Sequence, residues 1–358
     1  MTTNGASSIG AVGRPRRRWR RWLAVVAAIL AVVLALSYAG VSYAVYDGLA
    51  TAKGGCWPSA ASNTPDHFTL DAKWDAGLAA RYRMPTFQDV VFRSRDPSIG
   101  SVSLAAWWVP AGGASAASSP AVVVVHGIMS CRREASVLLA AGMLHQHGYS
   151  VFIMDMRNHG DSGFSPDRQI AGGSVEYLDV LGGWDWVREQ GVPADRIGIV
   201  GFSMGSGVVL TAGGEEPSVR AVWADSSFTK MDRALALFLK DQLRQQSSPL
   251  ALVSDTLVPG AVLWGRSRGV DFLKFNPIDE VAKYQGRHLA FVHGAEDAVL
   301  PASMSAENHD AAVAAGAHAA DVFVVPGAGH TEAVYADPSG YEARLTAFFG
   351  EALRPSGE

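Results

Sequence analysis

The chain has 358 residues, of which 48% are hydrophobic and 18% charged, so it holds enough apolar material for a sizeable core and is not globally disordered. Its formal net charge is -4, but the first 46 residues carry six Arg and no acid, which leaves 24 basic against 34 acidic residues in the remainder. A body this acidic would repel phosphate, so nucleic-acid binding is excluded as an expected function.

The N-terminal segment has the pattern of a signal anchor. Residues 1–21 are polar and then rich in Arg, and we expect a disordered basic tail that stays in the cytoplasm. Residues 22–46 carry no charge, and as a helix of about 1.5 Å per residue they would span roughly 37 Å, enough to cross a hydrocarbon core of about 30 Å. The positive-inside rule then places the following domain outside the cytoplasm, at the cell membrane.

Two other interpretations of this segment remain. A cleaved signal peptide would use Ser42-Tyr43-Ala44 as its cleavage site, although the apolar core of such a peptide is usually only about 7–15 residues long. A buried globular helix is disfavoured because nothing polar interrupts the run to make a solvent face.

The next segment, residues 47–66, is rich in Gly, Ser, Ala and Pro and is expected to link the anchor to a domain formed by residues 67–358. The chain has two cysteines, too few for a disulfide framework or a Cys-based metal site. Cys56 and Cys131 could pair outside the cytoplasm. We nevertheless expect two separate buried thiols, because pairing requires Cα atoms within about 7 Å of each other.

Beyond the linker, apolar strands alternate with helical patterns. A β-hairpin is expected first, and the continuous apolar run of residues 121–125 is typical of a strand buried on both faces. Strands that alternate with helices imply a mostly parallel sheet with helices on both faces, and ligands bind beyond the carboxyl ends of such strands. The expected strands are residues 87–92, 102–109, 121–125, 150–154, 197–200, 221–224, 288–292 and 321–325, and the expected helices are residues 134–146, 175–189, 204–212, 303–315 and 341–353.

The strongest local motif is Gly201-Phe202-Ser203-Met204-Gly205, between an apolar strand and a helix. A turn this tight would bring flanking side chains into collision, which explains a glycine two places to either side of the serine. The turn lifts the hydroxyl of Ser203 clear of the sheet at a helix N-terminus, where negative charge is favoured. Ser203 is therefore the expected nucleophile.

A serine hydroxyl needs a base, and histidine has a suitable proton affinity at neutral pH. Of ten histidines, His330 directly follows the last strand, on the face where Ser203 emerges, and is the expected base. His126, His159 and His293 also follow strands; the other six fall in helices, strand starts or the N-terminal region.

The base must be held in one tautomer by a carboxylate. Asp297 follows the strand at 288–292 and completes the chain order Ser, acid, His. Asp225, at the end of the preceding strand, is the rival, and Glu296 is expected to point elsewhere.

A tetrahedral intermediate also needs hydrogen-bond donors for its oxyanion. The backbone N–H of Met204 is one expected donor, and Ile128 N–H, in the loop after residues 121–125, is the other. Gly127 allows that loop to approach the site, and the alternative is an ordinary strand-end turn.

The polar turn at residues 155–163 is expected to brace these loops through Asp155 and Arg157. A metal site at Asp155, His159 and Asp161 is the alternative, but no His/Glu pair at helical spacing completes it. We expect no cofactor and no metal.

With these residues in place, the chain resembles the α/β-hydrolase superfamily and, within it, the membrane-anchored Bem46-like serine hydrolases. The resemblance covers about residues 80–352 and implies the same triad and an acyl-serine intermediate. Asn158 departs from it, since relatives usually have Gly there. The resemblance rests on His126-Gly127, residues 155–163, residues 201–205, residues 225–228, His293-Gly294 with Asp297, and Gly329-His330.

The sequence thus predicts a serine hydrolase that cleaves carboxylic esters or thioesters of small-molecule or lipid-like acyl substrates. An acyltransferase or peptidase with the same triad remains open, as does a non-catalytic scaffold. The insertion at about residues 226–285 could form a cap over an apolar acyl pocket, but most of its apolar side chains are expected to form the insertion's own core. These side chains are Leu235, Phe238, Leu239, Leu252, Leu257, Leu263, Trp264 and Phe272.

Overall fold

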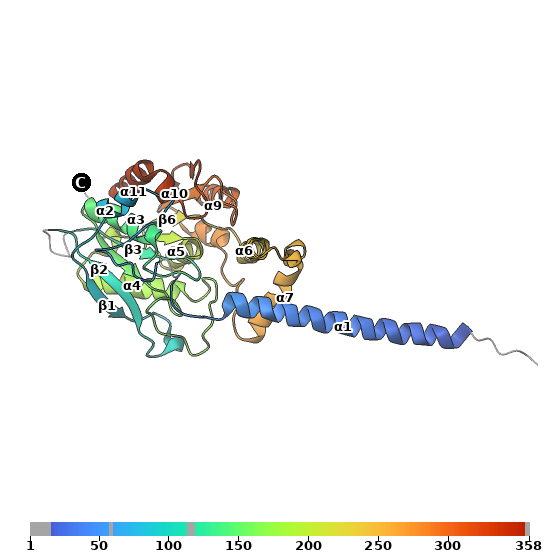
Figure 1. The fold of residues 1–358 in the computed structure, drawn as a ribbon. Helices are drawn as coiled ribbons and strands as arrows, with labels where there is room; N and C mark the ends of the chain where they lie inside the picture. Colours follow the sequence, from blue (N-terminus) through green and yellow to red (C-terminus); the bar gives the residue numbers. More distant parts are fainter. Residues whose placement is uncertain (1–15, 57–59, 113–118, 355–358) are drawn as a thin grey trace, which may run out of the picture.

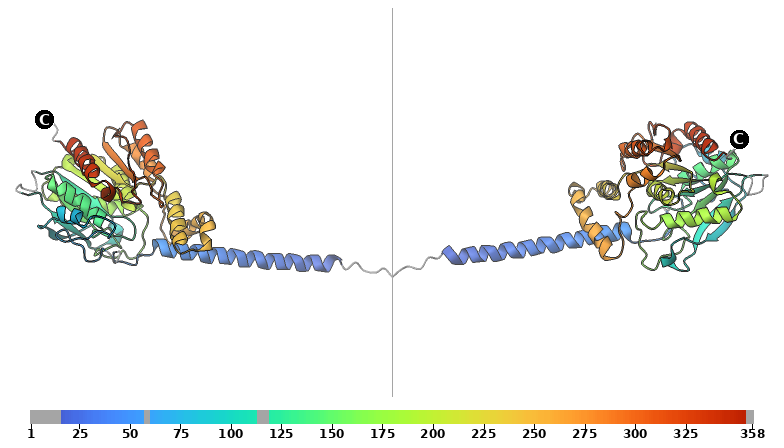
Figure 2. Two further views of the ribbon diagram at one scale, coloured as in Figure 1. Left: turned by 45° about the horizontal axis from the view of Figure 1, so that its top comes forward. Right: turned by 180° about the vertical axis from the view of Figure 1, so that it is seen from behind.

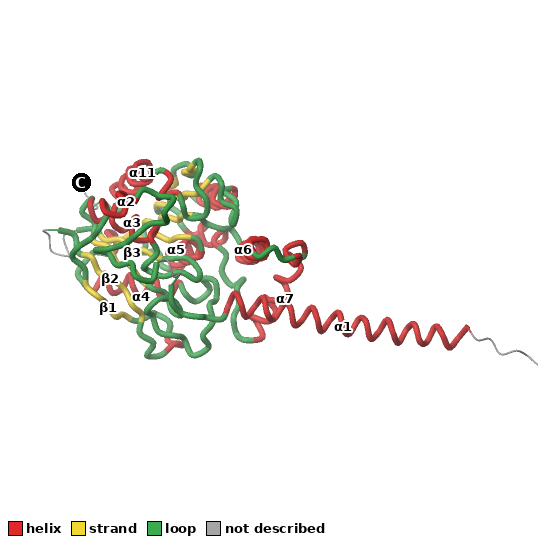
Figure 3. Tube along the Cα trace, in the orientation of Figure 1, coloured by secondary structure: helices red, strands yellow, loops and turns green. Residues whose placement is uncertain are grey.

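The computed structural model describes residues 16–56, 60–112 and 119–354 (Figure 1). Most of the expected basic tail, residues 1–15, lies outside the described residues. In the described part of the chain, the sheet and most helices form one body, and a single long helix extends away from this body, as Figure 3 shows.

The body is built on one sheet with the strand order β1-β2-β4-β3-β5-β6-β7-β8, in which β9 also pairs with β7. The expected hairpin is present: β1 and β2 are antiparallel, β2 is antiparallel to β4, and all other pairs are parallel. Expected and observed ends mostly agree within two residues, while β8 was not expected. The strands are β1 Gln88–Phe92, β2 Leu104–Val109, β3 Ala121–Val125, β4 Ser150–Met154, β5 Ile197–Phe202, β6 Ala221–Asp225, β7 His288–Gly294, β8 His318–Ala319 and β9 Phe323–Val325.

Helices cover both faces of this sheet, because the central strands are apolar on both sides. In β3, Val122 and Val124 join one core cluster, while Val123 and Val125 join the other. The first cluster packs against α2 (Ala76–Arg81), α3 (Ala135–Gln146), α10 (Ala333–Ala336) and α11 (Pro338–Ala352). The second packs against α4 (Tyr177–Glu189), α5 (Met204–Glu215) and α9 (Ser303–Ala314). The expected fold class, an α/β-hydrolase fold with a mostly parallel sheet, is confirmed.

The insertion between β6 and β7 is called the cap here. It contains α6 (Met231–Gln245), the 3₁₀ helix η4 (Pro249–Leu252) and α7 (Ser254–Ser267), followed by the short α8 (Pro277–Glu280) and η5 (Val281–Lys283). Its apolar core is shared with the end of the N-terminal helix, because Tyr46 and Leu49 pack among cap residues. Leu252 and Leu263, expected in that core, are instead exposed.

The N-terminal helix α1 (Arg16–Ala50) contains the whole expected span and continues through the first four residues of the expected linker. It is long and apolar enough to cross a membrane, by length and composition. From residue 38 onward α1 lies beside α7, and both views in Figure 2 show the cap between the body and the free part of this helix.

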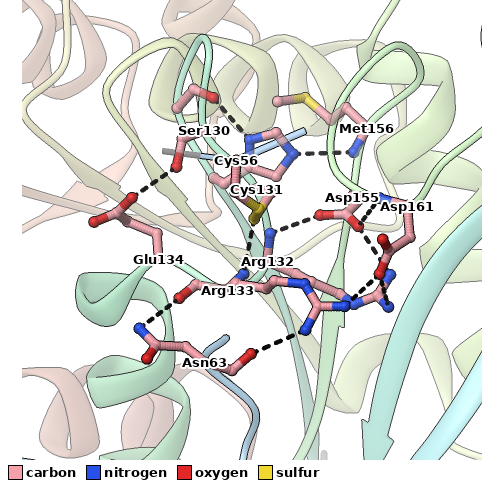
Figure 4. The surroundings of a disulfide bond; sticks show 12 residues. Cys56, Asn63, Ser130, Cys131, Arg132, Arg133, Glu134, Asp155, Met156 and Asp161 are labelled. Atoms are coloured by element: carbon pink, nitrogen blue, oxygen red, sulfur yellow. Dashed lines mark hydrogen bonds and ion pairs between the residues drawn. A yellow bond between two sulfur atoms is a disulfide. The ribbon is translucent and has the colours of Figure 1, made fainter. Parts of the chain in front are cut away.

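Residues 51–56 of the expected linker are held against the body by hydrogen bonds. Ala52 N–H donates to Arg168 O over 2.9 Å, and Gly160 N–H donates to Gly55 O over 3.2 Å. These contacts bring Cys56 to Cys131, with Cα atoms 5.3 Å apart, and the two form a disulfide (Figure 4). The expectation of two separate thiols was therefore wrong, because the docking of α1 and its extension places Cys56 at a loop 75 residues away in the chain.

Candidate active site

Ser203 sits on the sharp turn between β5 and α5. Its backbone has φ 53° and ψ −121°, a left-handed conformation that is strained for a residue with a Cβ. A Cβ on Gly201 would lie 2.3 Å from Gly205 O, and one on Gly205 would lie 2.4 Å from His126 O. Both glycines are therefore needed for the sterically tight turn that the sequence predicted.

Ser203, His330 and Asp297 form one hydrogen-bonded row. The distance from His330 Nε2 to Ser203 Oγ is 2.7 Å, and that from His330 Nδ1 to Asp297 Oδ2 is also 2.7 Å. The Asp297 side chain is fully buried, whereas the His330 side chain is 22% exposed. In this geometry Nε2 can accept the hydroxyl proton while the carboxylate stabilises the resulting imidazolium.

The carboxylate of Asp297 is held from several sides. The N–H groups of Val299 and Leu300 each donate to Oδ1 over 2.8 Å. Burial alone would raise the pKa of Asp297, but hydrogen bonds from His293 and His330 outweigh it and hold this pKa well below its usual range. Asp297 is thus kept ionised, as the partner of a histidine base must be.

His293 is a contact that sequence reasoning did not assign. It is fully buried at the end of β7, and its Nε2 lies 3.1 Å from Asp297 Oδ2 and 2.9 Å from Leu300 O. Both neighbours are acceptors, so Nε2 carries the proton, and Nδ1 accepts from Ser305 Oγ at 2.7 Å. Asp297 Oδ2 therefore has two imidazole donors. The only available signal was the spacing of four residues between this histidine and the acid.

Asp225, the rival acid, lies behind the row rather than in it. It is fully buried and accepts hydrogen bonds from Ser226 Oγ at 2.9 Å and Tyr341 Oη at 3.0 Å. Burial raises the pKa of Asp225 to about 6. Ser226 Oγ in turn accepts from Thr331 N–H at 3.0 Å, next to His330. Asp225 therefore supports the loop that carries the histidine, while Glu296 is exposed.

The loop after β3 passes directly over the serine. A Cβ on Gly127 would lie 3.2 Å from Ser203 Cβ, so only glycine lets the backbone come this near without adjustment. The N–H groups of Ile128 and Met204 have no hydrogen-bond acceptor within the described part of the chain, and both residues line the cavity above Ser203. Two free donors beside the hydroxyl are what an oxyanion requires.

The turn at residues 155–163 braces this loop by ion pairs. Asp155 accepts from Arg132 N–H at 2.6 Å and from Arg132 Nη1 at 2.8 Å (Figure 4). Arg157 binds Asp179 and Asp96, and all three side chains are nearly or fully buried. Sequence reasoning missed the partners Arg132, Asp179 and Asp96, which lie on other elements.

Within this turn, Asn158 has φ 67°, which explains why glycine is usual there in the resembling family. His126 and His159 are buried, and burial lowers the pKa of each, so both are neutral packing residues. The alternative metal site gains no support, because the described residues contain no group of three or more His, Cys, Asp or Glu that could hold a metal ion.

An apolar cavity of about 50 Å³ opens above Ser203. A volume of this size holds a few water molecules. Elements distant in the chain form the wall of this cavity. They are α1, the loop after β3, the loop after β7, α6 and the segment after α7. Its lining includes Leu49, Ile128, Met204, Met231, Leu235, Phe238, Phe272 and Leu300.

Comparisons with known proteins agree with this architecture. A family model described as "alpha/beta hydrolase fold" matches residues 120–257. An esterase from Pyrococcus furiosus superposes with a TM-score of 0.58 at 20% identity, covering 80% of this chain and 97% of the other. A hypothetical protein from Pseudomonas aeruginosa has a TM-score of 0.55 at 20% identity and coverages of 81% and 98%.

An acylaminoacyl peptidase from Pyrococcus horikoshii superposes with a TM-score of 0.55 at 19% identity, covering 79% of this chain and 45% of the peptidase. Among curated proteins, none matches the chain. At these identities the structural likeness shows the fold. The Bem46-like subgroup is not confirmed and stays a prediction.

Proposed function

We propose that this chain, which has the α/β-hydrolase fold, is a serine hydrolase that cleaves carboxylic esters or thioesters. The observation that carries the proposal is the row in which His330 Nε2 lies 2.7 Å from Ser203 Oγ and Nδ1 lies 2.7 Å from the buried Asp297. A hydroxyl, an imidazole and an ionised carboxylate in this order are the machinery of nucleophilic acyl transfer.

The proposed reaction has two halves. Ser203 Oγ attacks the acyl carbon while its proton passes to His330, and the negative oxygen is held by the N–H groups of Ile128 and Met204. His330 then gives the proton to the leaving alkoxide or thiolate, whose bond to the acyl carbon breaks, leaving an acyl-serine. Water attacks this ester by the same route in reverse, which releases the acid and restores the serine.

Ester or thioester substrates are favoured by the apolar lining of the cavity beside Ser203, which suits an acyl chain. A peptidase is the second candidate, supported by the fold shared with the acylaminoacyl peptidase. An acyltransferase would differ only in the nucleophile that resolves the acyl-serine. A scaffold without activity would retain the fold but would have no use for a strained Ser203 with φ 53°.

We also propose that α1 is an uncleaved membrane anchor with the catalytic domain outside the cytoplasm. The Arg cluster before residue 22 supports this orientation, and so does the disulfide, which persists in oxidising compartments. Retention of α1 is supported by its packing: Ser42, in the alternative cleavage site, is fully buried, and a Cβ on Gly260 of α7 would lie 2.2 Å from its Oγ.

Labelling with a fluorophosphonate probe tests the catalytic proposal. The wild type and Ser101→Ala, an exposed serine on the body, are expected to be labelled, and Ser203→Ala is not. Activity is then measured on p-nitrophenyl esters of increasing chain length and on acylaminoacyl anilides, with water or an added alcohol as acceptor. Absence of labelling in the wild type would support the scaffold, and preference for the anilides would support the peptidase.

A further inference from the structure

The cap presents an apolar surface on the side that faces the free part of α1. Leu252 of η4 is 89% exposed and Leu263 of α7 is 65% exposed, and Thr256 and Pro259 between them are also exposed. Large exposed apolar side chains grouped on adjacent elements mark a surface that contacts something other than water. The cap surface is defined here as Leu250, Leu252, Val253 and Leu263.

The length of α1 indicates what covers this surface. Its uncharged residues begin at position 22, and the helix lies beside α7 from Tyr38 onward. The unaccompanied apolar part is therefore residues 22–37, which is 16 residues or about 24 Å of helix. A hydrocarbon core of about 30 Å needs roughly four residues more. The outer end of the span must then include helix that is already packed against the cap.

Specific contacts set the level of the cap along α1. Tyr38 Oη donates to Thr256 O over 2.7 Å, and Trp264 Nε1 donates to Ala39 O over 3.0 Å. The first turn of α7, next to Leu252, thus lies at the level of Tyr38. The four further residues of α1 that the hydrocarbon core needs correspond to about 6 Å of helix. The cap would therefore enter the bilayer by about 6 Å, within the depth of about 5–10 Å that interfacial helices reach.

Charge distinguishes the cap from the rest of the domain. Residues 231–276 contain six basic and four acidic residues, whereas the rest of residues 47–358 contains 18 basic and 30 acidic. Arg268 lies over the Tyr43 ring, 5.9 Å from its centroid, just beyond the level of Ala39. Basic side chains at that height suit phosphate head groups. The exposed Asp255 at the start of α7 limits insertion to the interface.

The catalytic cavity lies on the other side of the same cap. Leu49 of α1 and Phe238 of α6 line it. When a cap seated in the bilayer moves, lipid tails rather than water contact the apolar surface that the movement exposes.

We propose that the cap surface lies in the outer leaflet of the lipid bilayer and that the cavity takes its acyl chain from a lipid ester in that leaflet. The substrate half of this inference rests on the proposed serine hydrolase function. The ester bond of the lipid is cleaved through the acyl-serine described above, with water as the second reactant, and a fatty acid and a lipid alcohol are released.

The test uses the full chain reconstituted in phospholipid vesicles. Leu252→Glu combined with Leu263→Glu is compared with Val91→Glu combined with Val313→Glu, which changes two exposed apolar residues on β1 and α9. Hydrolysis of a long-chain diacylglycerol in the vesicles and of water-soluble p-nitrophenyl acetate is measured for each. We expect the cap variant to lose about tenfold or more on the vesicle substrate, since burial of one Leu is worth about that factor. The soluble ester should be cleaved as by the wild type, and the control variant should match the wild type on both.

A label reports the seating of the cap independently of activity. The chain has only two cysteines, and both are in the disulfide, so Leu252→Cys provides one reactive thiol for a polarity-sensitive dye. The dye at position 252 should be quenched by brominated lipids and protected from iodide, and the same dye at Val313→Cys should not.

The outcomes separate the two proposals. If the wild type cleaves neither ester while lipid quenching at position 252 holds, the hydrolase function fails and the seating stands. If the wild type cleaves both but the glutamates affect both equally, or iodide reaches position 252 freely, the seating in the bilayer is refuted. Protection from iodide without lipid quenching would indicate a second protein copy on the surface and would also refute it.

Discussion

Reduction of the disulfide between Cys56 and Cys131 should destabilise the domain substantially. The bridge joins residues 75 apart in the chain. In the chain-entropy treatment, a closed loop of this length restricts the unfolded state by about 4–5 kcal/mol at 25 °C. For a domain of this size each kcal/mol corresponds to about 2–4 °C, so the melting temperature should fall by about 10 °C.

Differential scanning fluorimetry with and without dithiothreitol measures this effect. The variant in which both Cys56 and Cys131 are replaced by Ser is the control: it should melt near the reduced wild type and should not respond to the reductant. A fall of less than about 3 °C in the reduced wild type would contradict the reasoning, because the fastened segment at residues 51–56 would then be held equally well by its backbone contacts.

Three further substitutions test the site and its support. Asp297→Asn should lower kcat on a soluble ester by about 10⁴-fold, because the amide favours the wrong tautomer of His330, and a loss below tenfold in steady-state assays would contradict this role. The pKa of Asp225 is raised by burial to about 6, so the folded carboxyl keeps its proton in the window between about pH 4 and 6, where the unfolded chain has lost it. Its stabilising contribution is therefore complete at low pH and is lost as the pH rises through 6, by about 3 kcal/mol at most. Asp225→Asn should accordingly flatten the melting temperature against pH, relative to the wild type, and parallel curves would refute this. Gly205→Ala places a methyl 2.4 Å from the rigid His126 O and should cost about 3 kcal/mol or prevent folding, whereas Gly112→Ala, with open space around it, should be neutral by chemical denaturation.

Much of the sheet could be predicted because its central strands are continuous apolar runs bounded by turns. Parallel strands carry their C-terminal loops to one edge, so Ser203, Asp297 and His330 were expected together from their positions after three strands. The structure does bring them together, while their roles await the experiments above. The sterically tight Gly201–Gly205 turn could also be predicted, since its constraint is local.

Other features depend on packing between segments far apart in the chain, and no local pattern encodes them. Cys56 reaches Cys131 only because α1 docks on the cap, a contact that an uncharged helix does not reveal. Leu252 and Leu263 are exposed, although their residue type indicated a core. His293 contacts Asp297 because β7 ends in a particular register, and Arg132 meets Asp155 across two loops.

The short connection between α1 and the disulfide limits how far the α/β domain can travel. Five residues lie between Ala50 and Cys56, so the fully extended connection reaches only about 20 Å. Cys131 lies three positions after Ile128, so the disulfide connects the loop over Ser203 to the segment that directly follows α1. Even if the cap were to separate from α1, the loop over Ser203 could not move more than roughly two nanometres from the end of the helix. A partner that delivers substrate would have to work within that radius.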